Sequence, residues 1–244
     1  MGESSLAGSP DAFASEVDAR LRALADAGRA VQMRAYLLDQ FAFLGLPAPV
    51  RREAVKDLIR RPLAHADELM AVASALWARP EREFRYTAID LLRQQRRLLS
   101  PAELPALQTL LLREPWWETV DGLSAVISEV LHAARPLQPT APAAMDDWIV
   151  HEAFWVRRAA MLHQLGWRLD TDTARLSRYA LQLASEREFF IRKATGWALR
   201  DYARWNPGFV WAFVDAHRAE LSALTVREAC RVRTNPAGDT SSSR

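Results

Sequence analysis

The chain has 244 residues, of which 50% are hydrophobic and 25% charged, and 32 Lys and Arg residues nearly balance 30 Asp and Glu residues. This composition excludes wholesale disorder, and no stretch reaches the roughly 18 apolar residues of a membrane-spanning helix. The first residues lack a signal-peptide pattern, and Cys230 is the only cysteine, with no zinc-binding pattern in the sequence. We therefore expect a cytoplasmic globular protein without a disulfide, a metal site or a membrane contact.

The predicted elements are helices throughout. Ser9 followed by Pro10 is typical of a helix start, so residues 1–8 are expected to be disordered. Beyond this point apolar residues recur at helical spacing, and no run alternates in the manner of a strand. The clearest helical runs are 54–59, 88–92 and 123–131. Most prolines fall between such runs, where they begin or end helices.

Similar segments recur along the chain. The five that align are VRREAVKDL (50–58), FRYTAIDLL (84–92), WETVDGLSA (117–125), WVRRAAMLH (155–163) and FIRKATGWA (190–198). Their first residues are 34, 33, 38 and 35 positions apart, which leaves room for two helices and their turns, the size of a HEAT-like repeat. We predict an all-α solenoid of stacked HEAT-like helix pairs, curved around a concave face. It forms one domain over residues 9–233, followed by a disordered tail at 234–244.

The third segment carries a carboxylate where the other four have alanine. The fifth residues of the segments are Ala54, Ala88, Asp121, Ala159 and Ala194. Burying an unpaired carboxylate is costly, so Asp121 should either pair with a cation or face a groove that needs negative charge. A structural ion pair and a functional carboxylate both stay open on this pattern. Trp117 lies one helical turn before Asp121 on the same face, although aromatic residues also open other segments and are then core.

Basic residues accompany this position in the later segments. Arg158 precedes the alanine of the fourth segment, so stacked repeats would bring it near Asp121, and Lys193 occupies the same place in the fifth. Further basic residues nearby are Arg157, Arg192 and Arg200. Cations aligned in this way would follow the phosphate backbone of a nucleic acid. A solvated basic face without a partner is the alternative.

Several stretches together resemble one known family. They are YLLDQFAFLG (36–45), PEREF (80–84), WWETVD (116–121), WVRRAA (155–160), EFFIRKATGWALR (188–200) and LSALTVREA (221–229). On these residues the chain resembles the AlkD family of HEAT-like repeat DNA glycosylases, which remove alkylated purines. The resemblance extends over residues 33–230, and its paired-tryptophan and FFIRK blocks are specific in combination.

The resemblance implies a set of site residues. The family's catalytic cleft residues fall on Trp117, Asp121, Arg158 and Trp197. A tyrosine and two phenylalanines of the family's cleft fall on Tyr36, Phe189 and Phe190. Together with the basic residues, the candidates for DNA contact are Tyr36, Arg51, Arg52, Arg157, Phe189, Phe190, Arg192, Lys193 and Arg200.

The implied substrate is double-stranded DNA that carries N3- or N7-alkylated purines, such as 3-methyladenine, 7-methylguanine or bulkier adducts. Alkylation makes the base cationic and weakens its glycosidic bond, so the base can leave without a general acid. Asp121 alone would then stabilise the cationic sugar and position the attacking water. The family does this without flipping the base out of the duplex, unlike most glycosylases, and we expect no cofactor.

Two other functions stay open. A non-catalytic DNA-binding solenoid would have no need of Asp121 or Trp117, both of which are present. A protein-interaction scaffold would have no reason to replace alanine with Asp121, and its repeat face would carry acidic as readily as basic residues. We expect a monomer with no obligate protein partner.

Overall fold

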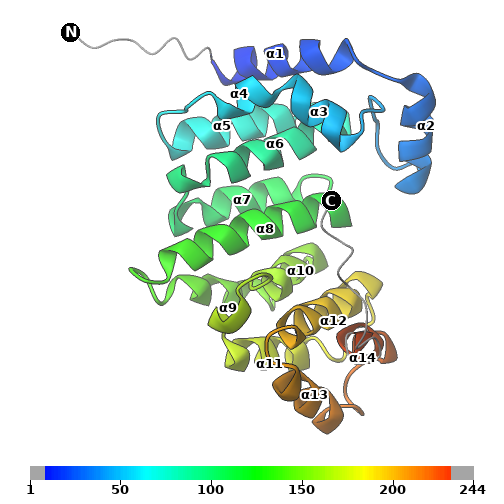
Figure 1. Ribbon diagram of the computed structural model, residues 1–244, viewed down its shortest axis with the longest axis vertical. Coiled ribbons are helices and arrows are strands. Elements are labelled where there is room, and N and C mark those ends of the chain that lie inside the picture. Colours follow the sequence, from blue (N-terminus) through cyan, green and yellow to red (C-terminus); the bar gives the residue numbers. More distant parts are fainter. Residues whose placement is uncertain (1–8, 232–244) are drawn as a thin grey trace. The chain divides into compact units, whose positions relative to one another are not determined.

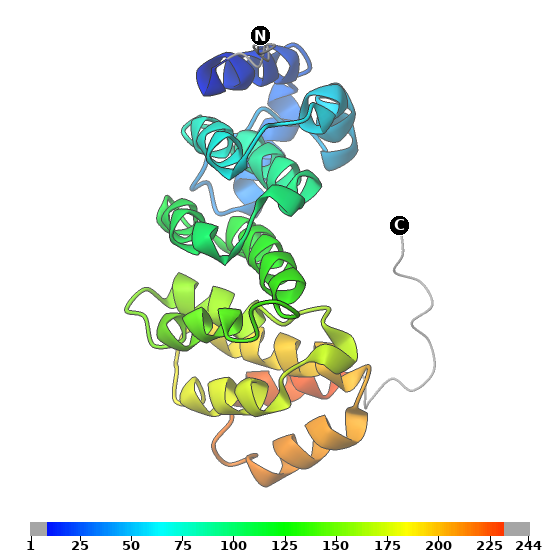
Figure 2. The ribbon, with the colours of Figure 1, turned by 90° about the vertical axis from the view of Figure 1, so that its left-hand side faces the viewer.

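The computed structural model describes residues 9–231, whose helices are shown in Figures 1 and 2. Over that range the chain forms fourteen α-helices, four short 3-10 helices and no strand, which confirms the all-α prediction. None of the helices in this range is both long and apolar enough to cross a membrane. The disorder predicted for residues 1–8 and 234–244 lies outside the described residues.

The described residues fall into two compact units, the first of which ends at Arg113. In this unit α1 packs on α5, α5 packs on α6 and α7, and α6 also contacts α3 and α4. The helices are α1 (Pro10–Arg22), α2 (Ala27–Tyr36), α3 (Ala48–Ala54), α4 (Lys56–Arg60), α5 (Ala66–Trp77), α6 (Arg82–Gln94) and α7 (Leu104–Leu112), with the 3-10 helices η1 (Arg96–Leu98) and η2 (Pro101–Glu103).

The second unit begins at Glu114. Its helix α10 packs against both α8 and α12, and α12 also contacts α11, α13 and α14. The helices are α8 (Trp117–Ala134), α9 (Ala144–Trp148), α10 (Phe154–Leu162), α11 (Thr173–Gln182), α12 (Phe189–Ala203), α13 (Pro207–Ala216) and α14 (Ala223–Ala229), with η3 (Ala141–Ala143) and η4 (Arg168–Asp170). The single domain over residues 9–233 stays a prediction.

The aligned sequence segments correspond to a structural repeat. They fall on α3–α4, α6, α8, α10 and α12. The repeat alanines Ala88, Ala159 and Ala194 are each 0% exposed, as close packing between helices requires. The spacing of the segments therefore predicted the recurrence of the helices, and its small residues mark their packed faces.

Polar side chains begin several helices where the sequence provides them. Ser9 caps α1, with its Oγ accepting a hydrogen bond from the amide of Ala12 at 3.3 Å, and Pro10 is the first helical residue, as predicted. Asp172 caps α11 and Ser222 caps α14 in the same way. Each cap satisfies an amide that the helix itself leaves without an acceptor.

Helix α2 is attached to the first unit by its ends. None of its residues is buried. The buried carboxylate of Glu83 accepts hydrogen bonds from the amides of Leu44, Gly45 and Leu46 at 2.9–3.1 Å, which fixes the loop after α2. Gly45 has φ +88°, and a Cβ on it would lie 2.1 Å from the carbonyl oxygen of Asp26. This close approach is possible only for glycine.

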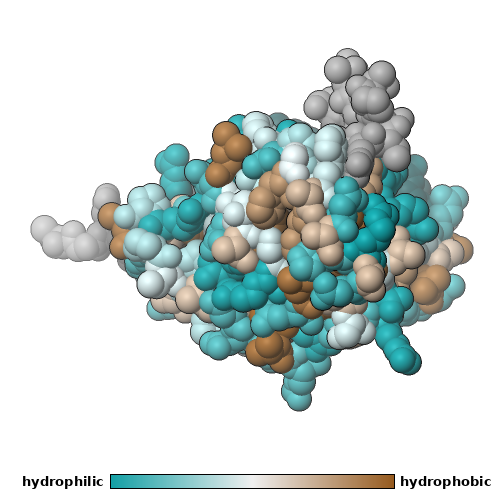
Figure 3. Space-filling view, turned by 90° about the horizontal axis from the view of Figure 1, so that it is seen from below, coloured by the Kyte–Doolittle hydropathy of each residue, from teal (hydrophilic) through white to brown (hydrophobic). Residues whose placement is uncertain are grey.

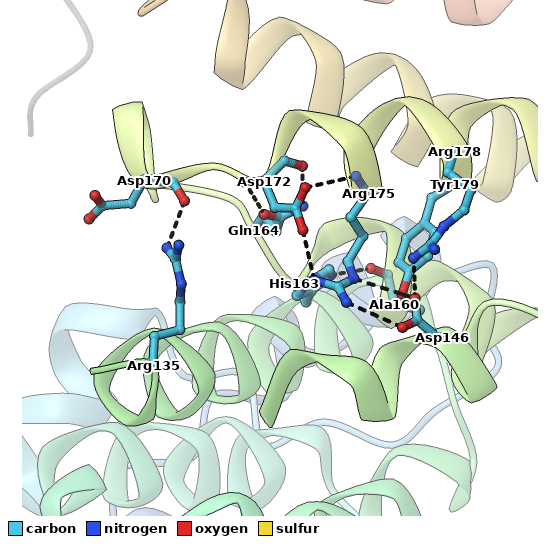
Figure 4. A network of polar contacts seen from close by, with 10 residues as sticks. All are labelled: Arg135, Asp146, Ala160, His163, Gln164, Asp170, Asp172, Arg175, Arg178 and Tyr179. Carbon is cyan, nitrogen blue, oxygen red and sulfur yellow. Dashed lines mark hydrogen bonds and ion pairs between the residues drawn. The ribbon is translucent and has the colours of Figure 1, made fainter. Parts of the chain in front are cut away.

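A polar network joins α9 to α11 in the second unit (Figure 4). Asp146 on α9 accepts hydrogen bonds from Tyr179 Oη at 2.6 Å and from Arg175 Nη2 at 3.2 Å, and it also pairs with Arg178. Arg175 pairs in addition with Asp172, at 3.0 Å. Because Asp146 and these donors lie on different helices, the network fixes the two helices against each other.

His163 lies beneath this network and is 1% exposed. Its Nδ1 donates a hydrogen bond to the carbonyl oxygen of Ala160 at 2.6 Å, and its ring packs against Trp167 and Tyr179. Burial lowers the pKa of His163 to about 4. The histidine is therefore a neutral core residue at physiological pH.

Exposed apolar side chains of the second unit come from separate places in the chain. The large ones are Leu137, Val150, Leu169, Phe189 and Trp205. On the face shown in Figure 3, hydrophobic residues form small groups separated by hydrophilic ones. Residues 9–231 thus form no single broad apolar surface on this face, of the kind that marks many protein-binding sites.

Candidate catalytic site

Asp121 lies in the second turn of α8, at the position where three of the other four segments bury alanine and the first has the partly exposed Ala54. Its carboxylate accepts two parallel hydrogen bonds from Arg158 on α10, from Nε to Oδ1 and from Nη2 to Oδ2, each 2.8 Å long. The side chain of Asp121 is 18% exposed and that of Arg158 is 5% exposed. The structure therefore brings Arg158 beside Asp121, as stacked repeats predict, and the bidentate geometry explains how this fold accommodates the carboxylate.

Two opposing effects act on Asp121. Burial, the larger one, raises the pKa of its carboxyl group above the ordinary value of 3.8, whereas the hydrogen bonds and charge of Arg158 act in the other direction. The carboxylate is thus poorly solvated and depends on a single cation. A second positive charge beside it would be strongly attracted, because the surrounding protein screens less than water does.

Arg158 also connects α8 and α10 to α12. Its Nη1 donates a hydrogen bond to the carbonyl oxygen of Phe190, and its guanidinium carbon lies 5.9 Å from the centroid of the Phe190 ring. Three of the five N–H groups of the guanidinium are thereby used within the protein. Since Arg158 is almost fully buried, its main role in this structure is to hold Asp121.

Aromatic rings support this arrangement. Phe190 packs against Trp116 at a centroid distance of 5.4 Å and against Trp155 at 5.0 Å, and the two tryptophans are 5.9 Å apart. Phe189, its neighbour in the sequence, is instead 51% exposed. Of the two phenylalanines, Phe190 thus supports Arg158, and Phe189 faces solvent.

The two tryptophans of the candidate cleft are partly exposed. Trp117 is the first residue of α8, one turn before Asp121, and Trp197 lies in the middle of α12. Both side chains are of intermediate exposure, unlike the buried alanines Ala88, Ala159 and Ala194. Each therefore keeps some ring surface accessible to a ligand.

The basic residues of the second unit differ in what they contact. Arg157 donates to the carbonyl oxygens of residues 151 and 152 and pairs with Glu186 at 3.0 Å. Arg192 donates to the carbonyl oxygen of Glu186 at 2.7 Å, and Arg200 pairs with Glu228 at 2.8 Å. Lys193 is exposed, with its Nζ 5.6 Å from the centroid of the Phe189 ring. Lys193 is thus the most available of these cations for a phosphate.

The remaining candidates lie in the first unit. Tyr36, the last residue of α2, is 73% exposed. Arg51 is 3% exposed, with hydrogen bonds to Thr87 and Asp90, and burial lowers the pKa of its guanidinium. Arg52 is 60% exposed and pairs with Asp90 at 3.1 Å. Tyr36 and Arg52 are therefore accessible to a ligand, whereas Arg51 is a buried partner of α6.

Sequence reasoning did not identify the groups that hold the site together. The carbonyl oxygen of Phe190 is a backbone atom, so no residue type marks it. Trp155 opens its segment in the same way as ordinary core aromatic residues do, and nothing in its spacing reveals its packing on Phe190. Among residues 9–231, no cluster of three or more His, Cys, Asp or Glu side chains could bind a metal ion.

Comparison with known proteins identifies the class of this chain. Residues 17–232 match the family model described as DNA alkylation repair enzyme, so the chain belongs to that family, whose role is DNA repair. A solved structure described as a predicted DNA alkylation repair enzyme from Enterococcus faecalis has a similar fold. It superposes with a TM-score of 0.77 at 29% identity and covers 86% of this chain and 97% of its own. A comparison with curated proteins found no match.

Proposed function

We propose that this protein is a DNA glycosylase of the AlkD type, which hydrolyses the N-glycosidic bond of cationic N3- and N7-alkylpurines in duplex DNA. The observation that carries the proposal is the Asp121–Arg158 pair: a partly exposed carboxylate with a raised pKa in a position that other repeats fill with alanine. Membership of a DNA alkylation repair family supplies the substrate class.

The chemistry follows from the charge of the lesion. As the bond between C1′ and the purine nitrogen breaks, its electron pair moves to the purine, which neutralises the base, and positive charge develops on the sugar. The carboxylate of Asp121 stabilises that charge, and its effect is strong because the site is shielded from water. A water molecule then adds to C1′ and loses a proton to Asp121 or to solvent, which completes hydrolysis.

In the proposal, Trp117 and Trp197 contact the sugar during this step. Their partly exposed indole rings hold the deoxyribose, and each attracts the developing cation by roughly 0.5–2 kcal/mol. Arg158 is a positioning residue, because its bidentate contact fixes the orientation of the Asp121 carboxylate. Because these side chains act on the sugar and not on the base, the base stays stacked in the duplex. Bulky adducts on the base are therefore tolerated.

The duplex is held by contacts to its backbone. Lys193 and Arg52 are the exposed cations among the candidates and bind phosphates, for which Arg52 gives up its ion pair with Asp90. Tyr36 and Phe189 offer exposed rings to the sugars. Arg51, Arg157, Arg192 and Arg200 are already engaged in the protein, so they add positive potential more than direct contacts.

One observation favours a different function. Both oxygens of Asp121 accept hydrogen bonds from Arg158, which is also how a purely structural ion pair would look. The chain would then be a non-catalytic DNA-binding protein of the same fold. Asp121→Asn separates the two functions: loss of base release with retained folding supports the glycosylase, and unfolding together with inactive wild-type protein supports the binder.

A further inference from the structure

Helix α12 presents a row of side chains that are exposed or partly exposed. Phe189, Lys193 and Trp197 follow one another at intervals of four residues, so at about 100° per residue they lie within roughly 80° of one another on the helix surface. We call these three residues the α12 stripe. Lys193 Nζ lies 5.6 Å from the centroid of the Phe189 ring, which shows that neighbouring members of the stripe meet.

One border of the α12 stripe is formed by α10. Around the axis of α12, Phe190 lies roughly 20° beyond Trp197 as counted from Phe189. Its ring packs on Trp155 of α10. Its carbonyl oxygen accepts the hydrogen bond from Arg158. This border is thus continuous with the Asp121–Arg158 pair.

The other border is formed by α14. Three residues of α12 contact it, again at intervals of four: Arg192, Gly196 and Arg200. The hydroxyl of Thr225 donates to the carbonyl oxygen of Arg192 at 3.0 Å. Arg200 Nη1 pairs with Glu228 Oε2 at 2.8 Å. At about 100° per residue, Arg192 and Gly196 lie roughly 60° and 20° from Phe189 on the side away from α10, and Arg200 lies between Phe189 and Lys193.

Gly196 is the central contact of this border. A Cβ on Gly196 would lie 2.5 Å from Glu228 Cβ and 2.8 Å from the carbonyl oxygen of Thr225. Neither atom is the end of a flexible side chain, so any larger residue must displace one helix relative to the other. Gly196 is buried within α12 and has an ordinary helical conformation. Close approach, and not a special backbone angle, is what requires glycine here.

We infer that Gly196 is a positioning residue for catalysis: it lets α14 dock against the α12 backbone and thereby sets the rotation of α12, which aims Trp197 and Lys193 at the bound DNA. The inference rests on the proposed glycosylase function. Trp197 directly follows Gly196, so a shift of α12 at this point moves the tryptophan ring with respect to Asp121. A displacement of about 1 Å can reduce a catalytic rate by up to about 100-fold.

The test compares two glycine-to-alanine substitutions in neighbouring helices. Gly196→Ala introduces the clash, whereas Gly208→Ala on α13 adds the same atom where the nearest contact is Asn206 Oδ1 at 3.9 Å. Each protein, in excess over methylating-agent-treated duplex DNA, is assayed for the single-turnover rate of 7-methylguanine release. Circular dichroism establishes folding, and fluorescence anisotropy gives the affinity for undamaged duplex.

The inference predicts that Gly196→Ala slows base release at least about tenfold at saturating protein. Gly208→Ala should stay within about twofold of wild type. A change in the folded fraction alone would not alter this rate, because the folded protein is in excess. If Gly196→Ala does not fold, Thr225→Val removes the hydroxyl contact to α12 without added bulk and should slow release several-fold.

Three outcomes count against the account, and they are distinguishable. An active wild type with equal rates for Gly196→Ala and Gly208→Ala overturns the positioning role and leaves the glycosylase function in place. If Gly196→Ala and Thr225→Val both weaken DNA affinity but keep the wild-type rate at saturation, α14 supports binding and not positioning for catalysis. A wild type that releases no base overturns the proposed function, and the inference falls with it.

Discussion

The pairing of Asp121 with Arg158 leads to a quantitative prediction for Arg158→Met. Methionine fills much of the arginine volume but removes both hydrogen bonds to Asp121 and the one to the Phe190 carbonyl oxygen. Breaking a buried pair leaves an uncompensated charge and costs about 3–5 kcal/mol. Because Asp121 keeps 18% exposure, some solvation remains, and we expect the lower end, a loss of about 3 kcal/mol in unfolding free energy.

A double-mutant cycle tests this reasoning. Asp121→Asn leaves the buried charge of Arg158 with neutral acceptors, the amide oxygen and the carbonyl oxygen of Phe190, which offset part of the lost pairing, so we expect a smaller loss of about 1–2 kcal/mol. The double variant, Asp121→Asn with Arg158→Met, leaves no charge unpaired. Its loss in unfolding free energy should therefore be smaller than the sum of the two single losses by about 1–3 kcal/mol. Urea unfolding followed by circular dichroism at pH 7 measures all four proteins. Additivity within about 0.5 kcal/mol would refute the pairing argument.

Three further predictions concern other parts of the chain. The pKa of His163 is about 4 in the folded protein against 6.5 as the ordinary value, so the unfolded state takes up a proton first as the pH falls from 6.5 towards 4. The free energy of unfolding should drop over that window by up to about 3 kcal/mol, and His163 should contribute nothing to its pH dependence above the window. His163→Phe should show a correspondingly smaller drop between pH 7.5 and pH 4.5 in urea titrations. An unchanged drop would argue against a buried neutral histidine. Lys193→Ala should weaken binding to duplex DNA of any sequence and lower the slope of log affinity against log salt concentration by about 1, without a change in melting temperature. An unchanged slope in an anisotropy titration would exclude a phosphate contact. Gly45→Ala should cost more than about 1 kcal/mol, because Gly45 has φ +88° and no space for a Cβ, and a wild-type melting temperature would contradict the close packing of α2 on its loop.

Most of what the sequence predicted about the fold came from the spacing of the repeated segments. Equivalent helices bury equivalent small residues, so Ala88 and Ala159 appear in register in the sequence and are both 0% exposed in the structure. The same register singled out Asp121 and placed Arg158 next to it, because neighbouring helices in such an array contact each other at equivalent positions. Helix starts were predictable where a cap residue precedes proline, as at Ser9.

The orientation of individual cations was not predictable in this way. Arg157 and Arg52 look alike in the sequence, yet Arg157 turns towards two backbone carbonyl oxygens and Glu186, whereas Arg52 is 60% exposed. A side chain's direction depends on acceptors in the loops around its helix, which periodicity does not report. The same holds for Gly196, whose role arises from the approach of α14, and for the backbone carbonyl oxygen of Phe190.

Release of free base from damaged DNA is the direct test of the proposed glycosylase activity. Purified protein is incubated with methylating-agent-treated duplex DNA, and free 7-methylguanine and 3-methyladenine are followed by chromatography, with Asp121→Asn alongside. We expect release by the wild type and none by an Asp121→Asn variant that is folded and melts within a few degrees of the wild type. Equal release by the two proteins, or no release by the wild type despite salt-dependent DNA binding, would contradict it.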